Sequence, residues 1–154
     1  MGLALPHPWR PGASLVMCVR HGDVLHLSGH MGVDMSRTVD FHGVSDHNPL
    51  VSGTVGREVA IEQACEIARG GSLNLIATLK AELGELSRVV RFLKVTAIVN
   101  ATEDLHEIHK VADAASDLLI AVFGEVGRHA RTTIGATTLP ADSCFAIEAM
   151  VAVS

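Results

Sequence analysis

Three side chains that could do chemistry lie close together near the carboxyl-terminal end of the chain. The sequence there is His129-Ala130-Arg131-Thr132-Thr133, and it begins a segment typical of a β-strand. The period-two alternation of a strand places His129, Arg131 and Thr133 on one face. An arginine in an apolar sheet is unfavourable unless it is paired. Arg131 therefore either pairs with an internal carboxylate, for which Glu148 on the neighbouring strand is a candidate, or binds an anionic ligand.

Histidines also gather in the first third of the chain, close to several aspartates: His21, His26, His30, His42 and His47. Imidazole and carboxylate groups are common metal ligands, but these spacings match no known ligand pattern, so we expect no metal site. A second group, His106-Glu107-Ile108-His109, differs from the zinc-protease helix motif because its histidines are three residues apart instead of four. We interpret it as a solvated helix face. Nucleotide-binding glycine motifs are absent from the sequence, and we expect no cofactor.

The elements that must position these side chains follow from hydrophobic periodicity and turn signals. An extended arm covers residues 1–12, and a hairpin with its turn at Gly22 follows. A long loop spans residues 30–56 and has room for one short strand near its end. The remaining predicted elements are helices over residues 58–83 and 104–123 and strands over residues 89–99, 130–139 and 145–153. The predicted order is β-β-(β)-α-β-α-β-β.

This order predicts an α+β fold, with a mixed sheet and both helices on one face. Nothing in the predicted elements covers the other face. The composition is 48% hydrophobic and the mean hydropathy is +0.33, so we expect that face to pack against copies of the same chain. Gly70 and Gly71 interrupt the long predicted helix, and they indicate either close packing or a kink.

Composition excludes several classes of function. The length of 154 residues fits one domain, residues 1–154, that can bury a core of its own. The net charge of −5 and the absence of a basic cluster argue against nucleic acid as a partner. The three cysteines have spacings that fit no disulfide framework. No membrane span or signal peptide is visible, so we expect a reducing, cytoplasmic location.

The order of motifs resembles the RidA/YjgF family of reactive-intermediate imine deaminases. The similarity runs from about Gly12 to the C-terminus, and its most specific part is SDLLxxVFGExGRHAR followed by GxxxLP. The chain is most similar to the YjgF/chorismate-mutase-like branch, which is named for an endoribonuclease. The resemblance implies a chorismate-mutase-like fold and a homotrimer with three ligand clefts between subunits. It also implies hydrolysis of an enamine or imine to a 2-oxo acid and ammonia.

The family's functional residues map onto several positions of this chain. Its key arginine is Arg131, which would bind the carboxylate of the substrate through the two-pronged guanidinium. Its main-chain contacts fall near the Ser28-Gly29 step, and a cysteine of some members corresponds to Thr133. We therefore expect Arg131, Gly29, Ser28 and Thr133 to bind a small carboxylate.

The chain also departs from the family pattern. The carboxylate expected fifteen residues after the arginine is Ala146, and only Glu148 remains in that strand. An asparagine of the second helix appears as Asp113. His129, Glu148 and His30 are then the candidate catalytic groups, because each could handle the proton of a water molecule. Two other functions stay open, namely a trimer that binds small carboxylates without catalysis and an endoribonuclease or translation inhibitor.

Overall fold

A mixed five-stranded sheet forms the centre of the computed structural model, which describes residues 5–12, 14–35 and 50–154. The strands are β1 (Cys18–His21), β2 (Val24–Met31), β3 (Val89–Asn100), β4 (Ala130–Ala136) and β5 (Phe145–Val153). Their order across the sheet is β1-β2-β5-β3-β4. Only β3 and β4 pair in parallel, whereas the other neighbours are antiparallel. Because β4 is an edge strand with one partner, Arg131 lies at the border of the sheet.

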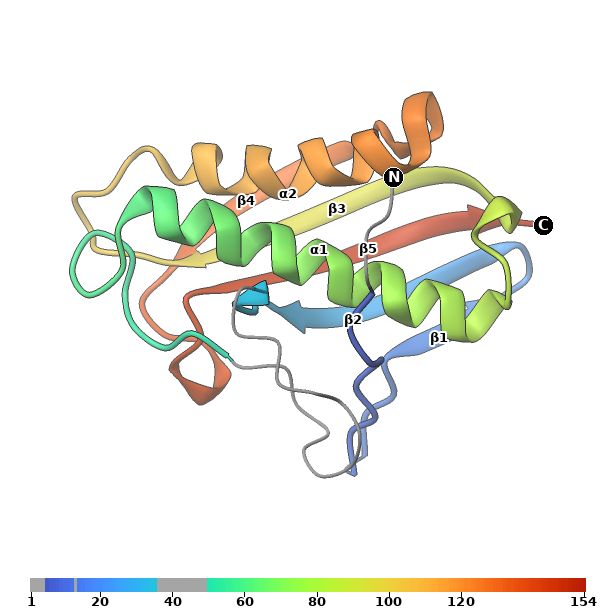
Figure 1. The fold of residues 1–154 in the computed structure, drawn as a ribbon, viewed down its shortest axis with the longest axis horizontal. Coiled ribbons are helices and arrows are strands. Elements are labelled where there is room, and N and C mark those ends of the chain that lie inside the picture. The colour runs from blue at the N-terminus through green and yellow to red at the C-terminus, as the bar shows by residue number, and fades with distance from the viewer. Residues whose placement is uncertain (1–4, 13, 36–49) are drawn as a thin grey trace.

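Both helices, α1 (Ile61–Leu83) and α2 (Ile108–Phe123), cover the same face of the sheet (Figure 1). The core lies between these two layers and includes Phe92, Phe145 and Leu75, all fully buried. The α+β class, the mixed sheet and the placement of both helices are therefore confirmed. The hairpin with its turn at Gly22 is also present, and Gly22 has a φ of 58°.

Several predicted boundaries differ from the structure. The first helix begins at Ile61 and not at residue 58, and β4 ends at Ala136 and not at residue 139. Residues 51–55 form isolated bridges instead of a strand, and residues 36–49 of the predicted loop lie outside the described part of the chain. The second helix begins at Ile108 and not at residue 104. The reason is that the Ala101 and Thr102 amides donate to the Ala136 and Val55 carbonyls, so this backbone is committed to the sheet edge.

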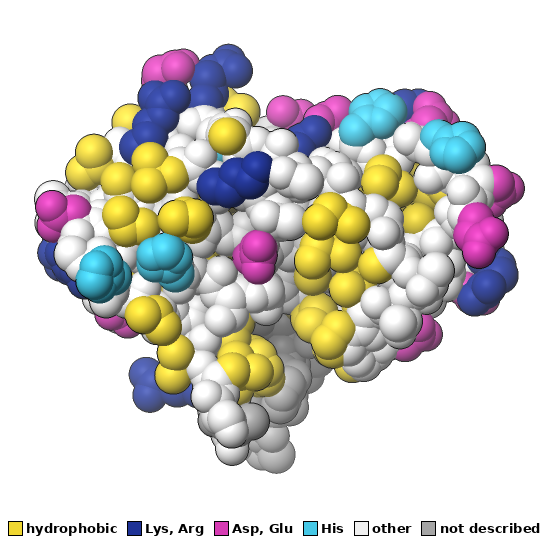
Figure 2. Space-filling view, turned by 180° about the vertical axis from the view of Figure 1, so that it is seen from behind, with side chains coloured by type: hydrophobic (Ala, Val, Ile, Leu, Met, Phe, Trp, Pro, Cys, Tyr) yellow, Lys and Arg dark blue, Asp and Glu magenta, His cyan; other side chains and the backbone are white. Residues whose placement is uncertain are grey.

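The face of the sheet away from the helices is open to the outside in this single chain. Figure 2 shows that it carries apolar side chains interspersed with basic, acidic and histidine side chains. Val19, Ile134 and Met150 are among the exposed apolar residues. No described helix is long and apolar enough to cross a membrane. The described cysteines, Cys18, Cys65 and Cys144, are all free.

Two adjacent glycines of helix α1, Gly70 and Gly71, pack closely against the segments beneath the helix. A Cβ on Gly70 would lie 2.1 Å from the Val33 carbonyl oxygen, and one on Gly71 would lie 3.1 Å from the Phe145 ring. The helix continues through both positions from Ile61 to Leu83. Of the two explanations for these glycines, close packing is the one that the structure supports.

Gly70→Ala is therefore expected to destabilise the protein, although alanine is the better helix former by about 1 kcal/mol. The added methyl group must push α1 away from backbone atoms of Val33, and such overpacking costs about 1–3 kcal/mol. Urea unfolding of the variant measures this loss. Gly12→Ala is the control, because nothing lies within 4 Å of its Cβ position. A Gly70→Ala protein as stable as the wild type would contradict the close-packing explanation.

Candidate functional site

Arg131 lies on the helix-facing side of the edge strand β4 and reaches across to α2. Its Nη2 atom is 2.7 Å from Oδ1 of Asp113, and its Nη1 donates to the Ser116 hydroxyl at 3.0 Å. The Arg131 side chain is 22% exposed. The sequence left open whether Arg131 pairs with an internal carboxylate or is free to bind an anion. An internal carboxylate does pair with Arg131, but it is Asp113 and not Glu148.

His129 shares this strand face and joins the same group of contacts. Its Nδ1–H donates to the Gly127 carbonyl at 2.6 Å, which leaves Nε2 as the acceptor of a hydrogen bond from the Ser116 hydroxyl at 2.9 Å. Burial lowers the pKa of His129, and the nearby charge of Arg131 lowers it further against the opposing effect of the Gly127 carbonyl. The ring is therefore neutral at pH 7 and able to accept a proton.

A surface depression of about 340 Å³ opens beside these groups. Acidic and basic side chains line it together with one serine, one histidine and one isoleucine: Asp113, Ser116, Asp117, Ile120, Arg128, His129 and Arg131. Arg128 is held by Glu125, with Nε 3.0 Å from Oε2. The lining of the depression therefore carries both negative and positive charges, which suits a small polar molecule that has a carboxylate.

Sequence reasoning missed Ser116 altogether and noticed Asp113 only as a departure from a family pattern. A signal was present, because Asp113, Ser116, Asp117 and Ile120 follow the i, i+3, i+4, i+7 spacing of one helix face. Three polar residues at those positions lie on the face that α2 turns toward β4. That stripe could have been matched with Arg131 once the topology was known.

Ser28 and Glu148 lie on the opposite, open face of the sheet. Together with Lys94 and Thr96 they line a second hollow of about 370 Å³. Glu148 is in register with Thr96 on β3, whereas Arg131 is in register with Val95. Neighbouring register positions point to opposite faces, so one chain does not bring Glu148 and Arg131 together.

Gly29 and Thr133 complete the set of predicted binding residues. Gly29 is exposed at a bulge of β2, where the register with β5 shifts between Leu27 and His30. Thr133 is half-buried two residues beyond Arg131 on β4. Within one chain, Arg131, His129 and Thr133 share a strand face, and Ser28 and Gly29 lie two strands beyond β3.

His30 lies beneath α1 and away from both hollows. It is 3% exposed, its Nδ1–H donates to the Ser28 carbonyl at 2.7 Å, and its Nε2 accepts from the Thr78 hydroxyl at 2.8 Å. Burial lowers its pKa to about 4, against the smaller opposing effect of the Ser28 carbonyl. Both nitrogens of the neutral ring are therefore satisfied inside the protein, which is the arrangement of a structural histidine.

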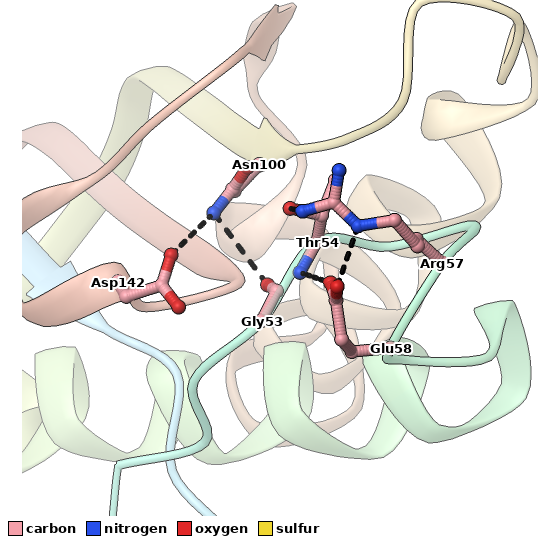
Figure 3. Close-up of polar contacts among 6 residues, drawn as sticks. All are labelled: Gly53, Thr54, Arg57, Glu58, Asn100 and Asp142. Carbon is pink, nitrogen blue, oxygen red and sulfur yellow. Dashed lines mark hydrogen bonds and ion pairs between the residues drawn. The ribbon is translucent and has the colours of Figure 1, made fainter.

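A separate polar group closes the carboxyl-terminal end of β3, and sequence reasoning did not anticipate it. The Arg57 guanidinium contacts Glu58, with Nε 2.5 Å from Oε1, and donates to the Thr54 hydroxyl at 3.2 Å (Figure 3). The second oxygen of Glu58 accepts from the Thr54 amide at 2.9 Å. Arg57, through its hydrogen bond and charge, holds the pKa of Glu58 below its usual value.

Asn100 connects this segment to the turn before β5. Its side-chain amide nitrogen lies 3.5 Å from the Gly53 carbonyl and 3.5 Å from Oδ1 of Asp142 (Figure 3). The same nitrogen lies 3.4 Å from the Ser143 carbonyl. Asn100 is fully buried, and its Oδ1 has no hydrogen-bond partner among the described residues. Asp142 has a φ of 53°, a left-handed conformation that these contacts support. The group fastens two loops to the sheet.

The described residues contain no group of three or more histidine, cysteine, aspartate or glutamate side chains placed to hold a metal ion. The side chains at the Arg131 site can recognise a carboxylate through the guanidinium and can accept a proton on the imidazole of His129. Asp113 must leave the guanidinium for an external carboxylate to take both of its prongs.

A sheet of this order, covered by two helices on one face, is the architecture of the chorismate-mutase-like proteins. The family profile described as YjgF/chorismate mutase-like, putative endoribonuclease, matches residues 30–152. The chain belongs to this family.

Relatives of the chain show the same similarity over nearly its whole length. Protein TCP17 of Trypanosoma cruzi is 32% identical over 152 residues, which are 98% of this chain and 88% of that protein. The crystal structure of Atu1372 from Agrobacterium tumefaciens, a protein of unknown function, has a TM-score of 0.83 at 31% identity. It covers 99% of this chain and 88% of its own.

Other solved structures extend the comparison. A putative endoribonuclease from Shewanella oneidensis has a TM-score of 0.86 at 27% identity and covers 99% of this chain and 93% of its own. RidA from the Antarctic bacterium Psychrobacter sp. has a TM-score of 0.55 at 18% identity, over 95% of this chain and 94% of its own. At that identity the likeness to RidA shows a common fold.

The buried His30 predicts a specific dependence of stability on pH. Below pH 6.5 the unfolded chain takes up a proton on this ring, whereas the folded protein does so only near pH 4. The stabilisation present above pH 6.5 is therefore lost as the pH falls to about 4, by about 3 kcal/mol. Urea unfolding at pH 7.5 and pH 4.5 measures the loss, and His30→Gln should remove most of this pH dependence. An equally steep loss in the variant would show that other groups cause it.

Proposed function

We propose that the protein binds a small carboxylate at Arg131 and hydrolyses an imine or enamine of a small acid to a 2-oxo acid and ammonia. One observation carries this proposal. The Arg131 guanidinium is partly exposed to a depression that also contains a neutral histidine. An imine is already an activated electrophile, so binding, orientation and modest proton transfer are enough for its hydrolysis. The match of Arg131 to the key arginine of the RidA/YjgF family supports the same activity.

Substrate binding would begin with exchange of one carboxylate for another. The Asp113 side chain is 53% exposed, so it can leave Arg131 for solvent. The incoming carboxylate would then take its place on Nη2, while Ser116 still orients Nη1. The charge of Asp113, released from Arg131 but still at the depression, would favour the protonated and more reactive iminium form.

The assembled protein in this proposal is a homotrimer with ligand clefts between subunits. Support comes from the exposed apolar side chains on the open sheet face and from family membership. Ser28 and Glu148 lie on that face, and Gly29 lies at the nearby bulge, all apart from Arg131 in one chain. A cleft between subunits is the arrangement in which one protomer's Arg131 could meet another protomer's Ser28-Gly29 step.

Ribonuclease activity has less support in the geometry, although a related crystal structure carries that name. The depression beside Arg131 includes two aspartates, and the chain has a net charge of −5. RNA binding depends on neutralising many phosphates with lysine and arginine. A single arginine already paired with Asp113 suits one small anion instead.

Arg131→Ala should lower kcat/KM for imine hydrolysis by about 10²-fold, because a charge-assisted hydrogen-bonded pair contributes about 1.5–3 kcal/mol. The assay supplies imino acids in situ from an amino-acid oxidase and follows release of the 2-oxo acid. Arg131→Lys is the matched control, since it keeps the charge and loses the two-pronged geometry, and an intermediate loss is expected. Equal turnover by wild type and Arg131→Ala would refute the proposal. Carboxylate binding without turnover would instead identify a non-catalytic binding protein.

Asp113→Asn should strengthen the binding of pyruvate by about tenfold, because the ligand no longer competes with an internal carboxylate for Arg131. Calorimetric titration measures the affinity. Asp117→Asn is the matched control, since it removes the same charge one turn further along α2 without releasing Arg131. An equal gain in both variants would mean that the general charge of the site matters, and not the Arg131–Asp113 pair.

A further inference from the structure

One hydroxyl group joins the two functional side chains of the Arg131 site. The Ser116 Oγ accepts a hydrogen bond from Nη1 of Arg131 at 3.0 Å and lies 2.9 Å from Nε2 of His129. His129 is fixed from behind, because its Nδ1 lies 2.6 Å from the Gly127 carbonyl oxygen. These three side chains come from different elements: Ser116 from α2, His129 from the segment before β4, and Arg131 from β4.

The direction of each hydrogen bond in this network follows from which groups can donate and which can accept. Arg131 can only donate, and the Gly127 carbonyl can only accept. His129 therefore carries its proton on Nδ1, and its Nε2 must accept the single proton of Ser116. A hydroxyl oxygen can accept two hydrogen bonds, and Arg131 supplies one. The second acceptor position on Ser116 is left for a donor from the depression, which Ser116 lines.

The surroundings keep the His129 ring ready to accept a proton. The ring is about half-buried and packs against Phe92, with ring centroids 6.3 Å apart. The charged groups around the depression come from α2, from the turn after it and from β4: Asp113, Asp117, Glu125, Arg128 and Arg131. Once His129 is protonated, the positive charge of Arg131 repels the ring, whereas Asp113 and Asp117 on α2 carry the opposite charge.

Ser116 and His129 could activate a water molecule, which Ala146 and Glu148 on β5 are not placed to do. Ala146 is apolar, so it cannot hold or activate water, and Glu148 lies on the open face of the sheet. We propose that Ser116 and His129 form a proton relay that activates the hydrolytic water next to a substrate held by Arg131. This inference rests on the proposed imine hydrolysis and adds Ser116 as a catalytic residue, with His129 behind it as the proton acceptor.

The relay gives a balanced reaction. The water molecule donates one proton to Ser116 Oγ, Ser116 passes its own proton to His129 Nε2, and the water oxygen forms a bond to the iminium carbon. The electron pair of the C=N bond moves to nitrogen and gives a carbinolamine. His129 then returns its proton through Ser116 to this nitrogen. The C–N bond breaks, the C=O bond forms, and ammonia leaves with the hydroxyl proton as ammonium.

The experiment compares Ser116→Ala, Ser116→Thr and His129→Gln with wild type in the coupled imine assay between pH 5 and 9. Ser116→Ala and His129→Gln should lower kcat by about 10²-fold or more, with KM changed by less than about threefold. Ser116→Thr keeps the hydroxyl and should recover most of the rate. Wild type should lose activity at acid pH as His129 becomes protonated, and this acid limb should be absent from the residual activity of both disabled variants.

Ser72→Ala is the matched control, because this buried serine on α1 donates to the Ala115 carbonyl, one residue before Ser116. It removes a hydrogen bond of a buried serine hydroxyl next to Ser116 without touching the relay, so its kcat should equal that of wild type. Thermal melts and pyruvate binding confirm that each variant folds and retains Arg131 in place. His129→Gln and its pH profile test the relay on their own if Ser116→Ala does not fold.

The outcomes separate the relay from the proposed function. Wild-type kcat in Ser116→Ala and His129→Gln would overturn the relay and leave imine hydrolysis standing. A rise in KM alone for Ser116→Ala would also overturn it, and would show that Ser116 only orients Arg131. Absence of hydrolysis by wild type for every imino acid tested would refute the proposed function and the relay together. Loss of kcat with rescue by threonine is the expected result.

Discussion

The helix layer is built on the close packing of α1 at its two adjacent glycines, Gly70 and Gly71. Gly70 and Gly71 allow the α1 backbone to rest against Val33 and Phe145, where any side chain would hold it away. α2 then packs beside α1, and the buried Ser72 hydroxyl joins the two helices at the Ala115 carbonyl. The polar face of α2 begins next to that bond. Arg131 on the edge strand β4 contacts this helix one residue further along, at the Ser116 hydroxyl.

Neutralisation of charge is the second constraint, and it connects stability with binding. An arginine on the inner side of a sheet edge needs a partner for its charge, and the half-exposed Asp113 provides one. His30 shows the opposite solution, since its ring is fully enclosed and uncharged. The same residue type therefore serves structure at position 30 and remains accessible to chemistry at position 129.

Sequence patterns predicted most of the fold because periodicity and turn signals are local. Residues 145–153 form a strand with the predicted bounds, and the shared strand face of His129 and Arg131 follows from alternation alone. The partners of Arg131 could not be predicted, because Asp113 and Ser116 are separated from it in sequence. Whether they approach Arg131 depends on how α2 lies against β4. The start of the second helix was predicted less accurately, since Ala101 and Thr102 pair with distant backbone groups and Leu105 turns back to Thr102.

The edge position of β4 also bears on how the site moves. β3 and β5 are each bonded to two strands, whereas β4 is bonded to β3 alone, so fewer hydrogen bonds must break for β4 to separate. Local opening of an edge element requires less free energy than global unfolding. Arg131 belongs to β4 and His129 to the segment just before it, and their contacts to Ser116 and Asp113 connect this part of the chain to α2. Amide exchange in β4 would consequently show whether a ligand bridges β4 and α2 as proposed, because such a ligand would oppose the opening of this edge strand.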